Sequence, residues 1–169
     1  MPDFDVVELP PADHVEPGER APDFTRPLVT AEYWEDVSLS DLTDEGPVLV
    51  VFYPMNGGGK SIYTWNEIRD REWTEFDATV VGVGIGHPFD NARFVEERGI
   101  DHGLFADPAN GVAEAYGVVH DLDGMAGVEE PRPAVFLVDE DRTVTYAWVA
   151  EEWPQRPPFD EIERELRRA

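Results

Sequence analysis

Lys60 and Ser61 are the residues whose types and position come nearest to a reactive site. They follow Val48–Tyr53, a run of β-branched and aromatic residues that is typical of a strand buried on both faces. Pro54 ends this strand, because proline offers no amide hydrogen to a central ladder, and the glycines after it allow a tight turn. We expect a helix to begin near Ile62. Free amide hydrogens at a helix start attract anions and activate nucleophiles, so Ser61 is the candidate nucleophile.

Two interpretations of Ser61 follow from this position. A hydrolytic serine needs a general base and an orienting acid close by, and none of the four histidines, at positions 14, 87, 102 and 120, has an evident pairing with it. The other interpretation is structural, because serine is strongly preferred as the residue that caps a helix start. The sequence favours a capping serine.

Nucleotide binding is a second candidate for the same stretch. Gly59-Lys60-Ser61 resembles the end of a phosphate-binding P-loop, and Val135–Glu140 resembles the apolar strand ending in Asp-Glu of nucleotide hydrolases. The full P-loop pattern requires glycine at position 54, where this chain has proline, so nucleotide hydrolysis is not expected. Lys60 is the only lysine of the chain, and beside helix-start amides it suits weak anion binding. The alternative is a solvated lysine on a loop.

Metal binding and thiol chemistry have less support. His87 ends an expected strand, on the side where ligands bind in open α/β sheets, and Asp107 and His120 are candidates for the same edge. No His-x-His or His-x₃-His spacing is present, so we expect neither a metal nor a cofactor. Cysteine is absent, which excludes disulfides, zinc–cysteine sites and every thiol mechanism.

Hydrophobic periodicity gives the elements that position Ser61. The expected strands are a hairpin of Thr25–Thr30 with Tyr33–Leu39, then Val48–Tyr53, Ala78–Ile85, Leu104–Ala106 as an edge strand, and the antiparallel hairpin of Ala134–Asp139 with Thr143–Ala150. The first expected helix follows Ser61, and the second covers Pro88–Arg98 with Phe89, Ala92, Phe94 and Val95 inward. The third begins at Asp107-Pro108 and stops at Gly117, and the fourth covers Phe159–Arg168. The strands on either side of the Ser61 helix should be parallel, with a right-handed crossover.

Domain organisation follows from length and composition. Residues 1–17 are polar and proline-rich and are expected to form an N-terminal arm, and residues 18–169 suffice for a single domain. No stretch approaches the roughly 20 apolar residues of a membrane span, and the N-terminus lacks the pattern of a signal peptide. We therefore expect a cytoplasmic protein that does not bind a membrane.

The charge of the chain is strongly negative. It has 37 acidic and 13 basic residues, a formal net charge of −24, and twelve of the basic residues are arginine. The acids are spread along periodic, aromatic-containing segments, unlike those of a disordered acidic tail. Abundant Asp and Glu with almost no Lys resembles proteins of halophilic archaea, whose cytoplasm is filled with salt. The charge argues against nucleic acid as a partner, because phosphates would be repelled and the sequence shows no basic patch.

The order of the elements, β-α-β, then helices, then β-β-α, resembles a thioredoxin-like domain. The resemblance implies an α/β three-layer sandwich with a central mixed sheet, here with an N-terminal β-hairpin extension. Short segments from Gly18 to Trp148 together resemble a peroxiredoxin of the alkyl hydroperoxide reductase C/thiol-specific antioxidant family, in its bacterioferritin-comigratory-like branch. These segments are Ala21-Pro22-Asp23-Phe24, Ser38-Leu39-Ser40-Asp41-Leu42, Val51-Phe52-Tyr53-Pro54, Arg69-Asp70, Leu104-Phe105-Ala106-Asp107-Pro108, Ala115-Tyr116-Gly117-Val118 and Phe136-Leu137-Val138-Asp139.

The chain departs from this family at the residues that carry the family's catalytic chemistry. The family places a proline, a threonine and the peroxidatic cysteine in a P-x-x-x-T-x-x-C loop, and the resemblance puts Pro54, Gly58 and Ser61 at these positions. The acidic or polar position three beyond the cysteine is Thr64. Arg132 lies one residue before the position of the family's active-site arginine, which Pro133 occupies. Thioredoxin-like redox proteins have a cis-proline there, so we expect Pro133 to lie close to Ser61, and the isomer of the Arg132–Pro133 bond stays open.

Peroxide reduction requires a thiolate that becomes a sulfenic acid, and a serine oxygen cannot follow that course. One hypothesis is therefore a non-enzymatic peroxiredoxin-like protein that binds a protein partner or small ligand through the old active-site face. The other is an oxidoreductase that works with a partner's thiol or by unrecognised chemistry. The identity of the partner and the oligomeric state, including a homodimer, stay open.

Overall fold

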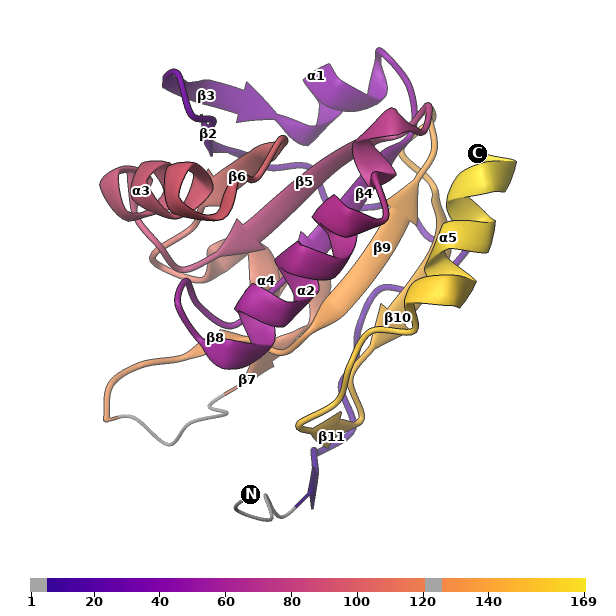
Figure 1. The fold of residues 1–169 in the computed structure, drawn as a ribbon. Helices are drawn as coiled ribbons and strands as arrows, with labels where there is room; N and C mark the ends of the chain where they lie inside the picture. The colour runs from indigo at the N-terminus through magenta and orange to yellow at the C-terminus, as the bar shows by residue number, and fades with distance from the viewer. Residues whose placement is uncertain (1–5, 121–125) are drawn as a thin grey trace.

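The computed structural model describes residues 6–120 and 126–169, and a seven-stranded sheet forms its centre (Figure 1). The order across the sheet is β10-β9-β4-β5-β6-β2-β3. These strands are β2 (Thr25–Val29), β3 (Trp34–Ser38), β4 (Val48–Phe52), β5 (Thr79–Gly84), β6 (Gly103–Ala106), β9 (Ala134–Val138) and β10 (Val144–Val149). β4, β5 and β6 are parallel, and the two hairpins add to them in antiparallel fashion, β9 beside β4 and β2 beside β6. The expected mixed sheet is confirmed.

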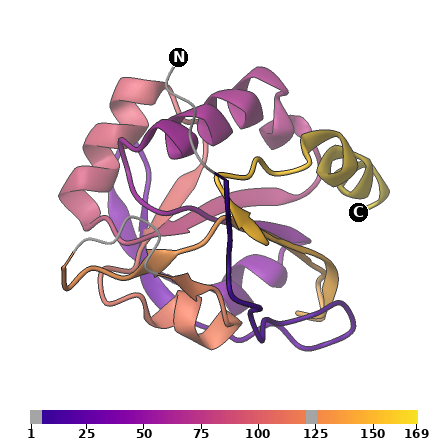
Figure 2. The ribbon, with the colours of Figure 1, turned by 90° about the horizontal axis from the view of Figure 1, so that it is seen from below.

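Helices cover both faces of the sheet, as the view from below shows (Figure 2). The helices are α1 (Leu39–Thr43), α2 (Gly59–Asp70), α3 (Pro88–Arg98), α4 (Gly111–Tyr116) and α5 (Phe159–Arg168), with a single 3₁₀ turn at Trp73–Glu75. α2, α3 and α5 pack on one face, and α4 with α1 packs on the other. The three-layer α/β architecture with an N-terminal hairpin extension is therefore the observed fold.

Alternation along β4 divides the core into two layers. Val48, Val50 and Phe52 face α4, and Leu49 and Val51 face α2, as successive side chains of a strand must. All five are buried, and each large apolar side chain of this kind contributes about 1.5–3 kcal/mol to stability. The continuous apolar run of β4 exists because both of its faces are covered.

Two expectations about the sheet and α3 are wrong. Leu104–Ala106 is not an edge strand, because Leu28 of the N-terminal hairpin pairs with Phe105 and the edge lies at β3 instead. Phe89 does not face the core. It is 73% exposed and contacts Trp34 of β3 edge to face, with 5.1 Å between the ring centroids. α3 thus buries Phe94 and Val95 as expected, but its first turn lies over the exposed hairpin.

The arm is tied to the domain by short contacts. β1 (Val7–Glu8) pairs with β11 (Glu152–Trp153), and the amide of Val15 donates to the carbonyl of Tyr116. A second small ladder joins β7 (Val119–His120) to β8 (Glu130–Pro131). Positions 1–5 of the expected arm, and positions 121–125, lie outside the described residues. Within the described part of the chain, no helix is long and apolar enough to cross a membrane.

Arg71 links the end of α2 to α5. Its guanidinium donates to Glu67 at 3.0 Å and to Asp160 at 2.9 Å. These contacts raise the pKa of Arg71, chiefly through the hydrogen bond to Glu67 and then through that to Asp160. Because α5 buries Phe159 and Ile162 against the α2 face, this exposed cluster fixes the approach of α5 and only adds modestly to stability.

His102 gives the fold a measurable pH dependence. Its ring packs on Trp65, with centroids 4.9 Å apart, and burial lowers the pKa of the imidazole. The unfolded chain takes up a proton near pH 6.5, and folded His102 does so only at lower pH. This histidine therefore costs stability as the pH falls below about 6.5. We expect the stability of the His102→Gln variant, relative to the wild type, to rise between pH 7.5 and pH 5. Parallel stability–pH curves in urea unfolding at fixed salt would contradict this expectation.

Candidate functional site

α2 begins earlier than expected, and Ser61 does not cap it. The capping position is Gly58, which has extended backbone angles and no side chain to accept the first amide hydrogens. Ser61 lies in the first turn instead and is only 2% exposed. The expected capping serine is therefore wrong, because three successive glycines let the chain enter the helix sooner. The helix start is left without a side-chain cap, which favours binding of an anion there.

A chain of hydrogen bonds fixes the loop before α2. The hydroxyl of Tyr53 donates to the side-chain oxygen of Asn56 at 2.9 Å, and the Asn56 amide donates to Asn91 of α3 at 2.7 Å. Burial raises the pKa of Tyr53, so its hydroxyl stays a donor. A side chain at Gly84 would collide with the Tyr53 ring at 2.7 Å, so glycine is required there. The loop is held rigidly although it carries no thiol.

Four of the residues singled out in the sequence lie together. Pro54, Ser61, Thr64 and Pro133 line one hollow at the start of α2, which we call the Ser61 hollow. The Thr64 hydroxyl donates to the Lys60 carbonyl at 3.0 Å, so it is engaged within the helix. The free space in the hollow is about 10 Å³, roughly room for one water molecule. The expected proximity of Pro133 to Ser61 is confirmed.

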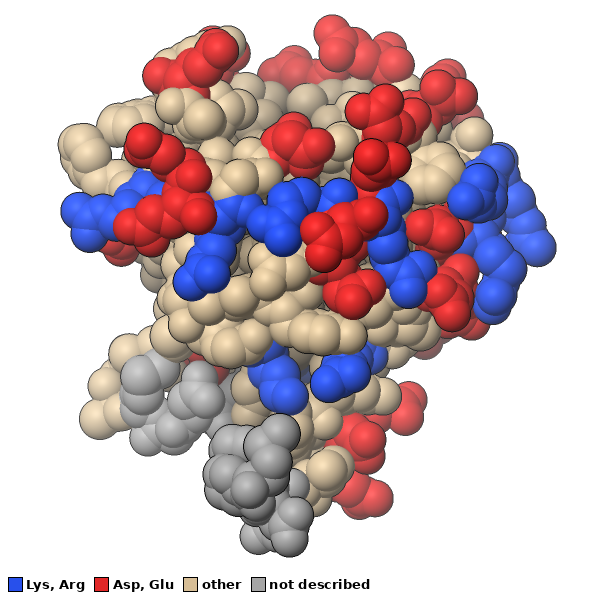
Figure 3. Space-filling view, in the orientation of Figure 1, with Lys and Arg blue, Asp and Glu red and all other residues tan. Residues whose placement is uncertain are grey.

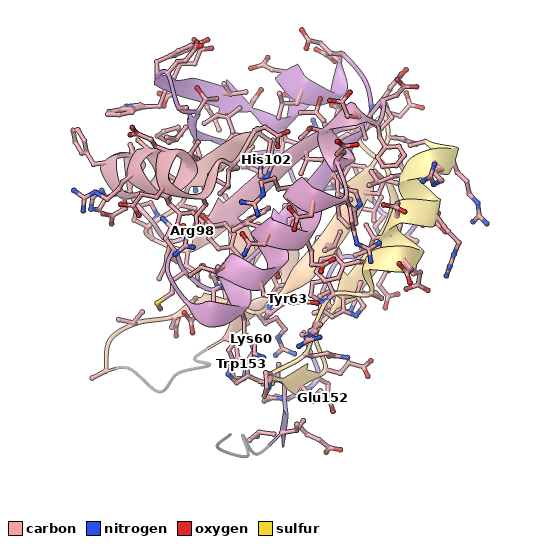
Figure 4. All side chains as sticks on the ribbon, viewed as in Figure 1. Lys60, Tyr63, Arg98, His102, Glu152 and Trp153 are labelled. Atoms are coloured by element: carbon pink, nitrogen blue, oxygen red, sulfur yellow. The ribbon has the colours of Figure 1, made fainter. Side chains whose placement is uncertain are left out.

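A segment from the far end of the chain covers this hollow. Residues 152–157, here called the strap, contribute Gln155, Arg156 and Pro157 to its wall. The guanidinium of Arg156 lies 4.4 Å from the centre of the Tyr63 ring, a cation–π contact. Figure 4 shows Lys60 and Tyr63 at the start of α2, with Trp153 of the strap nearby. The sequence alone did not place this segment beside Ser61.

Two basic side chains lie beside the hollow. Lys60, the only lysine, and Arg156 both line it. Figure 3 shows basic side chains below the start of α2, next to a mainly uncharged area of surface. Two cations and an uncapped helix start therefore face the same place, and all three attract an anionic group.

Arg132 points away from Ser61. It lines a different cavity, beside His14 and Ala150, whereas Pro133 lines the Ser61 hollow. The physical reason is the alternation of side chains in extended backbone, which sends neighbouring residues to opposite sides. An arginine shifted by one position therefore does not reach the Ser61 hollow. The Arg132–Pro133 bond is trans, and the cis proline bond of the described chain is Trp153–Pro154.

The rival sites do not assemble. β9 runs antiparallel to β4, with Val138 opposite Val48. Asp139 therefore lies near the beginning of β4, whereas Lys60 follows its end. Asp107 is 1% exposed and bonded to Arg26 and to the Val112 amide, and His87 pairs with Asp90 at the surface. Across residues 6–120 and 126–169, no three metal-binding side chains converge, and no histidine lines the Ser61 hollow. Among the described residues, no histidine is therefore placed to act as the general base of a hydrolytic Ser61.

Comparison with known proteins decides the family. The AhpC/TSA family profile matches residues 17–147, most of the chain. The chain belongs to the AhpC/TSA family of peroxiredoxins. A protein of Mycobacterium tuberculosis (strain CDC 1551 / Oshkosh) whose name places it among the peroxiredoxins is 32% identical over 110 residues, 63% of this chain and 69% of that protein.

Solved structures show the same fold. The peroxidoxin BcpB from Mycobacterium tuberculosis superposes with a TM-score of 0.74 at 26% identity, covering 92% of this chain and 96% of the other. The reduced 2-Cys peroxiredoxin of Plasmodium vivax gives a TM-score of 0.76 at 19% identity, covering 90% and 94%. This family member keeps the thioredoxin-like fold and has no cysteine anywhere in its sequence.

Proposed function

We propose that this AhpC/TSA family member is a binding protein rather than a thiol peroxidase, and that it acts in the cytoplasm. Its ligand or protein partner presents an anionic group to the surface around the Ser61 hollow. The observation that carries the proposal is the pairing of Lys60 and Arg156 beside an uncapped helix start, in a chain whose net charge is −24. Peroxide reduction needs a sulfur atom that can be oxidised and reduced again, and position 61 offers only a hydroxyl.

The peroxidase half of the proposal is tested by supplying hydrogen peroxide with thioredoxin or a dithiol in molar salt and following peroxide consumption. We expect the wild type and the Ser61→Ala variant to match the protein-free rate. Turnover by the wild type above that of Ser61→Ala would support an oxidoreductase acting with a partner's thiol and would end the proposal.

The binding half is tested by affinity capture from a cell extract in molar salt. The bait is the wild type, the double variant Lys60→Gln/Arg156→Gln, or the control Arg98→Gln, which removes an exposed arginine of α3 outside the hollow. We expect the wild type and Arg98→Gln to retain a ligand held by the proposed surface. The amount retained by the double variant should fall at least about tenfold, because two charge-assisted contacts are lost. Equal retention by all three would show that this face does not bind it.

A further inference from the structure

Arg132 is a buried cation that has no counter-ion among residues 6–120 and 126–169. It is 4% exposed, and Nη1 donates to the carbonyl of Ala150 at 3.2 Å. Nε is buried and has no hydrogen-bond partner among the described residues, and none of their carboxylates lies within ion-pair distance of this guanidinium. Burial lowers the pKa of Arg132, as expected where the charge is desolvated and not compensated.

A buried charge without a counter-ion lowers the stability of the fold. Removing a charge from water costs several kcal/mol even in a relaxed protein, and a lone carbonyl offsets little of it. The chain has 37 acidic residues, yet none of those described forms an ion pair with this arginine. An anion from outside the described part of the chain would compensate this charge.

A cavity of about 390 Å³ provides the place for that anion. Arg132 lines it, and the arm closes one side with Leu9, Pro10 and Pro11, facing Val149 at the end of β10. Glu8, Glu151 and Glu152 also line it and are exposed at its rim. Their charges repel a divalent anion such as phosphate more strongly than a monovalent one, and Leu9, Pro10 and Val149 offer contacts to a short hydrocarbon tail.

We propose that this cavity, distinct from the Ser61 hollow, binds a small monocarboxylate through Arg132. Nη1 is engaged with Ala150, and the guanidinium of Arg132 pairs with a carboxylate through charge-assisted hydrogen bonds. The carboxylate belongs either to a free short-chain acid or to the C-terminus of a peptide, and its chemistry is the same in both.

The experiment is isothermal titration of the full chain in molar potassium chloride. The probes are butyrate and its neutral isostere butyramide, followed by N-acetyl-Ala-Ala and its C-terminal amide. We expect butyrate to bind and butyramide not to bind, in spite of the excess chloride. Tighter binding of the free peptide than of butyrate would assign the carboxylate to a peptide terminus, and the reverse order to a free acid.

Two variants test the role of Arg132. Arg132→Met keeps the length of the side chain and removes the charge, and we expect the Kd for butyrate to rise at least about tenfold. Arg98→Met removes an exposed charge on α3 and should leave the Kd unchanged. Equal binding of butyrate and butyramide by the wild type, or no binding of butyrate, overturns the proposal without any variant. Unchanged affinity in a folded Arg132→Met variant overturns it as well.

Discussion

In dilute buffer the protein is expected to lose much of its stability. At about 0.01 M salt the screening length is about 30 Å, comparable to the diameter of the domain, and at about 1 M it is about 3 Å. A formal net charge of −24 then repels itself across the whole molecule. A loss of about 4 kcal/mol would lower the Tm by about 10 °C for a domain of this length. Thermal unfolding followed by circular dichroism in potassium chloride measures this directly.

The control separates charge repulsion from a general effect of salt on protein solubility. Glu32, Glu35 and Asp36 are exposed acids on the N-terminal hairpin, and none of them takes part in an ion pair in the described structure. Their joint replacement by the corresponding amides should reduce the salt dependence of the Tm and leave the Tm in molar salt nearly unchanged. The same Tm at both salt concentrations in the wild type would refute the interpretation of the charge as an adaptation to salt.

The second large effect is expected at position 61. A Ser61→Cys thiol lies beside two cations and a helix start, which favour the thiolate, but the strap leaves about 10 Å³ free around it. It should therefore react with a disulfide reagent more slowly than an exposed cysteine. Adding Tyr63→Leu removes the ring under Arg156 and keeps the cation. A contact of about 0.5–2 kcal/mol is lost, so the rate should rise by roughly 2- to 30-fold.

A matched control exists on the same face of the sheet. Arg167 lies 5.1 Å from the ring centre of Phe76, so Phe76→Leu removes a similar cation–π contact that does not involve the strap. In the Ser61→Cys background, this change should leave the labelling rate within about twofold of the single variant. If Tyr63→Leu and Phe76→Leu accelerate labelling equally, the strap does not restrict access to position 61.

Local pattern was enough to predict most of the fold. The buried run of β4, the parallel β5, the C-terminal hairpin and the stop of α3 at Gly99 follow from periodicity and from the properties of proline and glycine. The grouping of Pro54, Ser61 and Pro133 followed from the family resemblance and is seen in the structure.

What failed depends on contacts between distant segments. The position of β6 inside the sheet is set by the hairpin docking on it, and Phe89 is exposed because its partner Trp34 lies on that same hairpin. The strap reaches Ser61 from about 90 residues away, and nothing local to Arg156 indicates that it meets Tyr63. The orientation of Arg132 turned on a single position of register, which sequence similarity does not resolve.

The placement of α5 has a consequence for synthesis. Phe159, Ile162 and Leu166 complete the apolar layer that α2 and α3 begin, and α5 is the last element of the described chain. On the ribosome, the N-terminal part of the chain emerges first. Strands β2 to β6 can therefore assemble before α5 is available to cover the α2 face of the sheet. The nascent protein therefore exposes an apolar surface until α5 has left the exit tunnel, and the charge of its acidic residues keeps it apart from neighbouring chains.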